Sequence, residues 1–255
     1  MKALNFLSAV LSVSGSLIVL SSPVSAGEDT PEWSYGGENN PTQWGQLSEE
    51  FAVCEIGRDQ SPIDVDEATV GTPSDIAFNY ASVPLAVVND GHTVQVNYPE
   101  GSTISIDGEE YELLQFHFHT PSEHTVEGRA AAMELHLVHS NEAGELAVVG
   151  VMLEAGESNP AVDIIWAHIP KEEGTKQVEN TMINAADLLP DSTAYFGYTG
   201  SLTTPPCSEG VRWNILQEPI QVSEEQIDVF EALYQVDARP VQPTNGRIIE
   251  LHEEK

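Results

Sequence analysis

Two short runs of alternating residues constrain the fold of this chain more than any other feature. The first is QFHFH at residues 115–119, and the second is MELHLVH at residues 133–139. Alternation of polar and apolar residues is the pattern of a β-strand, in which side chains two positions apart share a face. His117 and His119 therefore point the same way, and His136 joins them if the two strands pair.

Three histidine nitrogens with one open position form the ligand set of a catalytic zinc site, whereas four ligands close a structural zinc site. Gln115 lies two residues before His117, and Glu134 lies two residues before His136. A ligating imidazole needs its other nitrogen bonded to an acceptor, and both side chains are placed to accept. Three ordinary histidines in a sheet are the alternative interpretation.

Short strands separated by turns are predicted for most of the remaining chain. Residues 93–98 alternate, and residues 104–106 alternate before an Asp107-Gly108 turn. The apolar run over residues 146–153 predicts a buried central strand. These patterns predict a single domain that is mainly β with short helices (α+β).

Two short helices are expected. Asn159 and Pro160 form an N-cap followed by a first-turn proline, and this helix should stop before residue 170. Ser223 and Gln226 form a capping box. That box precedes three apolar residues spaced for one buried helix face, namely Ile227, Phe230 and Leu233.

The first 26 residues have the order of a secretory signal peptide. Lys2 precedes a largely apolar stretch from Ala3 to Leu20, and small residues lead to Ala26. Polar residues interrupt the stretch, which disfavours the alternative of a retained membrane anchor. We predict a signal peptide over 1–26, a mature domain over 27–255 without a membrane span, and a periplasmic or secreted location.

Charge and cysteine content narrow the class of protein further. The formal net charge of −32 excludes a generic binder of nucleic acid or anionic membranes. A solvated acidic surface and an adaptation to salty surroundings both explain this charge. Cys54 and Cys207 are the two cysteines of the chain, and export predicts a disulfide between them; two free buried thiols are the alternative.

Several motifs are spread along nearly all of the mature domain: residues 33–36, 60–63, 89–92, the two histidine runs, 122–126, 200–206 and 239–243. Through these motifs the chain resembles the alpha-class carbonic anhydrases, in particular their bacterial exported branch. The resemblance implies one large, mostly antiparallel twisted sheet of about ten strands, with zinc at the base of a conical cleft. It also implies one Zn²⁺ per chain, held by His117, His119 and His136.

The resemblance also implies the roles of further residues. Thr203 donates its hydroxyl hydrogen to Glu123 and accepts from zinc-bound hydroxide, because an ionised carboxylate can only accept. The N–H of Thr203 and the hydroxyl of Thr204 bind substrate oxygens, and His92 is the proton shuttle. A loop threonine and an exposed loop histidine are the plainer interpretations.

Two larger sets complete the implied site. Val138 lies two residues after His136, so alternation places it on the histidine face, and the resemblance adds the rest of an apolar wall for carbon dioxide: Val148, Leu202, Val211 and Trp213. Ordinary core packing is the alternative for this wall. The proton-relay water network is formed by Tyr35, Asp90 and Gln95, whereas His124 and His139 match buried scaffold positions.

These residues predict a zinc lyase that hydrates carbon dioxide reversibly to bicarbonate and a proton, by attack of zinc-bound hydroxide with a histidine proton shuttle. Its partners are the small-molecule substrate and sulfonamide or anion inhibitors, and the resemblance also allows a homodimer. One alternative is a non-catalytic carbonic-anhydrase-like binding module, which would lose zinc ligands. Another is an envelope zinc-scavenging protein, which would carry histidine-rich tracts. The chain keeps all three histidines, Glu123 and Thr203, and has no such tract.

Overall fold

The structure is a computed structural model that describes residues 31–72 and 74–254. The signal peptide predicted over 1–26 lies outside these residues. Among the described residues, no helix combines the length and the apolar composition that a membrane crossing requires.

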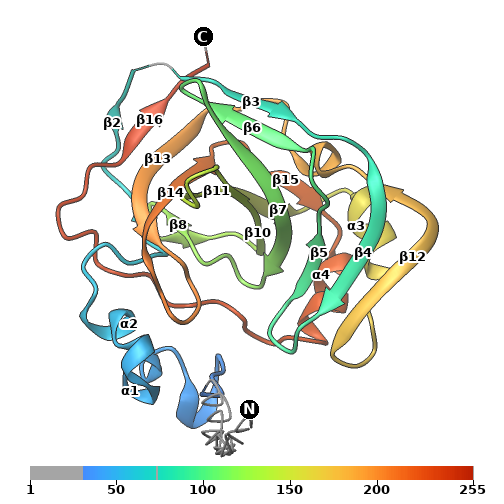
Figure 1. The fold of residues 1–255 in the computed structure, drawn as a ribbon, viewed down its shortest axis with the longest axis horizontal. Helices are drawn as coiled ribbons and strands as arrows, with labels where there is room; N and C mark the ends of the chain where they lie inside the picture. Colours follow the sequence, from blue (N-terminus) through green and yellow to red (C-terminus); the bar gives the residue numbers. More distant parts are fainter. Residues whose placement is uncertain (1–30, 73, 255) are drawn as a thin grey trace, which may run out of the picture. The chain divides into compact units, whose positions relative to one another are not determined.

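Strands make up most of the fold (Figure 1), as the alternating patterns predict. In chain order they are β1 (Asp64–Val65), β2 (Thr69–Val70), β3 (Ile76–Asn79), β4 (Val83–Asn89), β5 (Val94–Asn97), β6 (Thr103–Ile106), β7 (Glu109–His119), β8 (Thr125–Val126), β9 (Arg129–Ala130), β10 (Met133–Ser140), β11 (Leu146–Ala155), β12 (Gly174–Ile183), β13 (Tyr195–Ser201), β14 (Glu209–Leu216), β15 (Ile220–Val222) and β16 (Glu250–His252).

Within the described residues, thirteen of these strands form one sheet, whose main path is β12-β4-β5-β7-β10-β11-β14-β13-β16-β2. The expected large sheet is confirmed, but it is mixed. Strand β11 runs parallel to β14 and β15, and β16 runs parallel to β2. The chain between β11 and β14 is long enough to carry α3, β12 and β13, and parallel neighbours require such a crossover.

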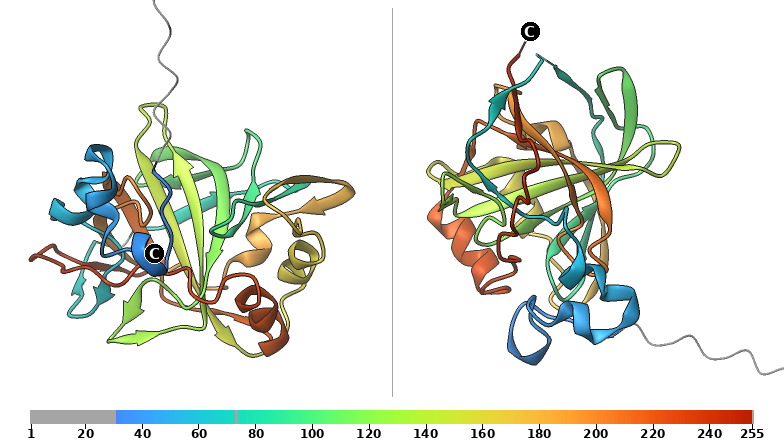
Figure 2. Two further views of the ribbon diagram at one scale, coloured as in Figure 1. Left: turned by 90° about the horizontal axis from the view of Figure 1, so that it is seen from below. Right: turned by 90° about the vertical axis from the view of Figure 1, so that its left-hand side faces the viewer.

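The helices are short. They are α1 (Trp44–Leu47), α2 (Val53–Ile56), α3 (Pro160–Trp166) and α4 (Glu224–Glu231), with 3₁₀ turns η1 (Gly37–Asn39), η2 (Glu49–Phe51) and η3 (Ala185–Leu188). Figure 2 shows α3 and α4 together on one side of the sheet. Asn159 caps α3, and both bonds of the capping box between Ser223 and Gln226 are present at α4.

One predicted core position of α4 is wrong. Ile227 and Phe230 are buried as expected, but Leu233 is 44% exposed. The helix ends at Glu231, so the periodicity that would turn Leu233 inward no longer applies.

The large sheet carries an apolar layer on each face. On the face that we call the reverse face, Phe116 and Phe118 belong to the larger core, which α3 and α4 cover through Val162 and Phe230. A second cluster, which includes Trp213, lies on the opposite face. Because Trp213 packs against the ring of His136, we call this the histidine face.

Candidate metal centre

Antiparallel pairing of β7 and β10 brings the three predicted histidines together. His117 lies directly opposite His136, and His119 lies opposite Glu134. One ligand atom from each of His117, His119 and His136 lies within 4.8 Å of the others. The pairing shifts register only between Val138 and His139, outside the stretch of the ladder that carries the three histidines, so their alignment stays regular.

Each of the three rings is held by a hydrogen bond from one of its nitrogens. His117 Nδ1 donates to Gln115 Oε1 at 2.8 Å, and His136 Nε2 donates to Glu134 Oε1 at 2.9 Å. The structure therefore brings both predicted acceptors into contact with their histidines. His119 uses a partner that the sequence did not reveal, because its Nδ1 donates to the backbone carbonyl of Asp237 at 2.7 Å.

The remaining nitrogens suit a metal ion. They are Nε2 of His117, Nε2 of His119 and Nδ1 of His136, and the His119 nitrogen is buried without any hydrogen-bond partner. Polar atoms in protein interiors are almost always bonded, so this unbonded nitrogen supports a ligand role. Neutral imidazoles fixed by a second bond are the typical ligands of zinc.

Burial and nearby carboxylates act in opposite directions on the pKa values of the three rings. Burial and the neighbouring histidines hold the pKa of His117 well below its usual value, which keeps that ring neutral. Burial alone would lower the pKa of His119, but the carboxylates of Glu123 and Asp237 raise it overall. A cation at this point is therefore stabilised by nearby carboxylates.

Glu134 serves two histidines at once. Its Oε1 accepts from His136 and from Nδ1 of His124, and its Oε2 accepts from the His124 backbone N–H. Burial would raise the pKa of Glu134, but the two histidines hold it well below the ordinary value. Gly150 leaves space here, because a Cβ at this position would lie 3.1 Å from Glu134 Oε1 and 2.7 Å from Ile215.

The predicted hydrogen bond from Thr203 to Glu123 is not formed in the structure. Glu123 Oε1 accepts from the Arg239 backbone N–H at 2.8 Å, and its Oε2 is buried without a partner. That oxygen lies 3.6 Å from His119 Nε2 and 3.9 Å from His136 Nδ1. The carboxylate is thus directed at the rings, and the donor–acceptor pair stays a prediction.

The predicted apolar wall gathers on the histidine face. Val138 pairs with Val148 across β10 and β11, and Val148 pairs with Trp213 across β11 and β14. The Trp213 ring lies 4.8 Å from the His136 ring. All five predicted wall residues belong to or pack against one cluster: Val138, Val148, Leu202, Val211 and Trp213.

His92 lies apart from the three rings, in the turn between β4 and β5. Its ring stacks on Trp33 with centroids 3.8 Å apart, and its Nε2 lies 3.0 Å from the Trp33 carbonyl oxygen. A pocket of about 450 Å³ is lined by His92 together with Tyr35, Asp90 and Asp237. The predicted shuttle therefore sits beside a hollow that also reaches the Asp237 segment.

The predicted water-network residues have separate surroundings. Asp90 Oδ1 accepts from the backbone N–H groups of His92 and Thr93, so this carboxylate stabilises the turn and not the His92 ring. Gln95 donates to Asn97 at 2.6 Å and lies opposite His117 in the sheet. Burial, with help from nearby carboxylates, holds the pKa of Tyr35 well above its usual value, so its hydroxyl stays protonated.

The geometry agrees with comparisons to known proteins. The model of the family described as eukaryotic-type carbonic anhydrase matches residues 39–253. The chain belongs to this family. Its members are in general zinc-dependent, and the clustered histidines are the corresponding feature here.

Relatives of the carbonic anhydrase family match over most of the chain. A carbonic anhydrase from Nostoc sp. is 46% identical over 226 residues, which are 86% of each chain. The solved complex of Thermovibrio ammonificans alpha-carbonic anhydrase with the inhibitor sulfanilamide is 40% identical, with a TM-score of 0.84, and covers 87% of this chain and 100% of that chain. Dioscorin complexed with ascorbate is 30% identical, with a TM-score of 0.81, and covers 88% of this chain and 99% of that chain.

The disulfide predicted between Cys54 and Cys207 is present. The sulfur atoms lie 2.08 Å apart and the Cα atoms 5.1 Å apart. The Cys207 N–H donates to the carbonyl of Thr204. In this carbonic anhydrase fold the bridge therefore ends next to the loop that carries Thr203.

Two buried histidines belong to the scaffold, as predicted. His124 bonds to Glu134 through one nitrogen and to the Tyr198 hydroxyl through the other. His139 lies 2.7 Å from the Tyr80 hydroxyl and 3.2 Å from the Ala147 carbonyl. Neither ring has a nitrogen left for a metal.

The sequence interpretation missed three residues of this site. Trp33, Asp237 and Arg239 contact His92, His119 and Glu123 respectively. Asp237 is 118 positions from His119, and its contact is made by a backbone carbonyl, so no side-chain pattern could have indicated it. Trp33 and Arg239 do stand in motifs that carry the family resemblance, and this was the available signal.

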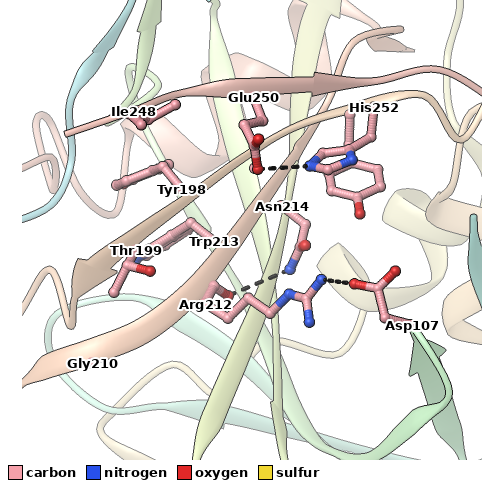
Figure 3. Close-up of a pocket in the computed structure, with 12 residues that line it drawn as sticks. Asp107, Tyr198, Thr199, Gly210, Arg212, Trp213, Asn214, Ile248, Glu250 and His252 are labelled. Atoms are coloured by element: carbon pink, nitrogen blue, oxygen red, sulfur yellow. Dashed lines mark hydrogen bonds and ion pairs between the residues drawn. The ribbon is translucent and has the colours of Figure 1, made fainter. Parts of the chain in front are cut away.

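A second hollow, of about 400 Å³, lies across β13, β14 and β16 (Figure 3). Arg212 there binds Asp107 at 2.6 Å, and Glu250 lies 3.8 Å from His252. Arg212 and Asn214 alternate with Trp213 on β14, so their side chains project from the reverse face. None of the three metal-centre histidines lines this hollow, and we assign no part of the carbonic anhydrase site to it.

Proposed function

We propose that this chain is a zinc enzyme that hydrates carbon dioxide reversibly to bicarbonate and a proton. One observation carries the proposal: three histidine rings, each fixed through one nitrogen, converge with their other nitrogens on one point. One Zn²⁺ per chain would be held by His117, His119 and His136. Membership of the carbonic anhydrase family supports the same activity.

Zinc, when bound, supplies a Lewis acid that ionises water near neutral pH; carbonic anhydrase is the reference case, and its value of about 7 belongs to that enzyme class and is not obtained from this chain. The residues of the chain supply the geometry. Gln115, Glu134 and the Asp237 carbonyl fix the tautomer and direction of the three rings. Glu134 keeps its negative charge, which increases the basicity of the ring that donates to it.

The apolar wall would hold carbon dioxide beside the histidines. Carbon dioxide is apolar overall, and burial of apolar surface is favourable without any directional bond. Val138, Val148 and Trp213 lie side by side across β10, β11 and β14, and the Trp213 ring is 4.8 Å from that of His136. Thr203 and Thr204 would orient the oxygens of substrate and bicarbonate through one backbone N–H and one hydroxyl group.

Glu123 would determine whether the Thr203 hydroxyl donates or accepts a hydrogen bond toward the ligand. An ionised carboxylate can only accept, so a Thr203 hydroxyl bonded to Glu123 presents its own oxygen as an acceptor. This requires Glu123 Oε2, which is unbonded in the structure, to take the Thr203 hydrogen. A ligand that donates a hydrogen bond to the Thr203 oxygen is then favoured over a ligand that has no hydrogen to donate.

The proton would leave through His92. An imidazole is the side chain best suited to accept and release a proton near neutral pH. Its stacking on Trp33 holds the ring at the pocket beside Tyr35, and ordered water with Tyr35, Asp90 and Gln95 would complete the relay. The contacts of Asp90 place its carboxylate on the turn backbone, so we expect it to influence the turn more than the ring.

Export is part of the proposal. A signal peptide over 1–26 would be removed to leave the domain 27–255 in the periplasm or outside the cell. The disulfide supports an oxidising compartment. A homodimer is a further expectation, and sedimentation velocity of the mature chain tests it directly.

A stopped-flow proton-release assay tests the activity. The mature chain with zinc should hydrate carbon dioxide, and the chain stripped of zinc should lose that rate and recover it when zinc is returned. Sulfanilamide should inhibit the loaded enzyme. A loaded chain with one zinc per molecule but no rate above buffer would overturn the proposal.

A further inference from the structure

A buried arginine near the C-terminus joins parts of the site that are far apart in sequence. Arg239 is 2% exposed and belongs to a motif over residues 239–243 for which the proposed chemistry gives no role. One of its guanidinium nitrogens donates to the Ser61 carbonyl at 2.7 Å, and another donates to the Cys54 carbonyl at 2.9 Å. Its planar fork therefore fixes two points of the N-terminal segment at once.

The backbone of the same residue holds Glu123. The Arg239 N–H donates to Glu123 Oε1 at 2.8 Å. Two residues earlier, the Asp237 N–H donates to the Thr120 carbonyl, so the segment is attached to the end of β7 beside Glu123. The position of the Glu123 carboxylate thus depends on where this segment lies.

The side chain of Arg239 is linked to the loop that carries Thr203. Its two partners, Ser61 and Cys54, bond to residues that come before and after Thr203 in the chain. Ser61 exchanges hydrogen bonds with Ser201: the Ser61 N–H donates to Ser201 Oγ, and the Ser201 N–H donates to Ser61 Oγ. Cys54 is bonded covalently to Cys207, whose N–H donates to the Thr204 carbonyl. The loop of Thr203 is therefore attached before and after that residue to the two groups that Arg239 binds.

The guanidinium keeps its charge in this environment. Burial lowers the pKa of Arg239 to about 10, which is still well above neutral pH. Among the described residues no carboxylate forms an ion pair with it, and its nearest aromatic partner is Trp44, 5.8 Å from the ring centroid. A buried charge costs stability, so the two carbonyl bonds and the aromatic ring have to compensate.

We infer that Arg239 is a positioning residue, which sets Glu123 and the loop of Thr203 relative to each other. The inference rests on the proposed function, because it assigns the residue to the donor–acceptor pair of that mechanism. Arg239 contacts none of the three histidines and touches no substrate. Its side chain therefore affects the relative affinity of the site for different ligands, and it does not affect the affinity for zinc.

Arg239→Lys and Arg239→Met test this inference. Lysine keeps the charge but lacks the fork that reaches two carbonyl groups, and methionine removes the charge with little change in length. Both variants keep the backbone N–H that binds Glu123. Arg212→Lys is the matched control, because Arg212 binds Asp107 on the reverse face (Figure 3) and has no contact with the site.

The measurement is the ratio of two affinities in zinc-loaded protein. Sulfanilamide offers an N–H that Thr203 can accept only while its own hydrogen is committed to Glu123, whereas thiocyanate has no hydrogen to donate. We expect Arg239→Lys to weaken sulfanilamide binding about tenfold, the order of one lost hydrogen bond, with thiocyanate and zinc binding within about twofold. If Arg239→Met does not fold, Arg239→Lys alone decides.

Each outcome separates this inference from the proposed function. Wild-type protein that binds zinc but neither hydrates carbon dioxide nor binds sulfanilamide overturns the proposed function. Active wild-type protein whose Arg239 variants keep the wild-type affinity ratio overturns the role of Arg239 alone. Equal loss of both affinities, or the same change in Arg212→Lys, also overturns it, because a general loosening of the fold would then explain the effect.

Discussion

His136 and His139 lie three residues apart on β10, and both are buried, yet they have opposite chemistry. His136 donates from Nε2 to Glu134 and keeps Nδ1 free on the histidine face. His139 lies on the reverse face, where the Tyr80 hydroxyl and the Ala147 carbonyl occupy both of its nitrogens. The difference between a ligand and a scaffold residue is therefore one unoccupied nitrogen, not burial or residue type.

His124 makes the same distinction on the histidine face itself. Its centroid is 6.1 Å from that of His136, and His124, Glu134 and His136 also lie close enough to suggest a second metal cluster. Hydrogen bonds to Glu134 and Tyr198 use both nitrogens of His124. Proximity of ligand atoms is thus insufficient to define a metal site unless their partners are counted.

Removing the free Nδ1 of His136 should cause the largest loss of zinc affinity. His136→Ala should weaken zinc binding by more than about 100-fold, since changes to outer partners alone cost 10- to 100-fold, and hydration should fall with it. Metal titration against a competing chelator measures the affinity. His139→Ala should keep one zinc per chain where it folds; loss of zinc from that variant would break the comparison.

Replacing Glu134, the acceptor of the His136 hydrogen bond, should lower zinc affinity by a smaller factor. Glu134→Gln removes the negative charge and puts an amide N–H₂ among N–H groups, so zinc affinity should fall about 10- to 100-fold. The same chelator titration applies. Glu154→Gln, on an exposed position of the neighbouring β11, is the control, and an unchanged affinity in Glu134→Gln would show that ring orientation does not depend on this carboxylate.

His92 differs from both buried histidines, because it lines a pocket and stacks on Trp33. His92→Ala should reduce maximal turnover about tenfold or more at low buffer concentration while leaving kcat/KM for carbon dioxide unchanged. Added imidazole buffer should restore turnover. His168→Ala is the control, because in the described part of the chain this half-buried histidine bonds only to the Ile164 carbonyl of its own segment, and it should behave as wild type. Loss of kcat/KM in His92→Ala would place its role in substrate binding.

The smallest effect concerns the stability that His139 provides. Burial lowers its pKa to about 3, so the unfolded chain takes up a proton more readily than the folded one below pH 6.5. Stability from this group is complete above pH 6.5 and falls as the pH decreases, by about 2 kcal/mol at pH 5.

His139→Gln should retain both hydrogen bonds, with its amide donating to Ala147 and accepting from Tyr80. Urea unfolding at pH 7 and pH 5 should therefore show less acid destabilisation in this variant, by about 2 kcal/mol. His168→Gln, at a half-buried histidine outside the core, serves as the control. Equal acid sensitivity of His139→Gln and wild type would contradict the assignment of a neutral buried ring.

Local patterns predicted the parts of this molecule that depend on neighbours in sequence. Alternation placed His117 and His119 on one face, and the motif of Ser223 and Gln226 predicted the start of α4. The partner of His119 was not predictable in this way, because Asp237 reaches it through a backbone carbonyl after a long separation. The parallel pairs of β11 were missed for the same reason, since strand order depends on crossovers that leave no periodic signal.

Leu113 pairs with His139 and Gln115 pairs with Val138, so Leu114 is the extra residue of the bulge in β7, and it is 44% exposed. This break separates the outer part of the β7–β10 ladder from the inner part. Leu113 and Phe116 both face the larger core although they are three positions apart, so the alternation of side chains in β7 changes phase at Leu114. The pattern that places His117 and His119 on one face therefore holds only for the inner part of the strand, which carries the metal ligands.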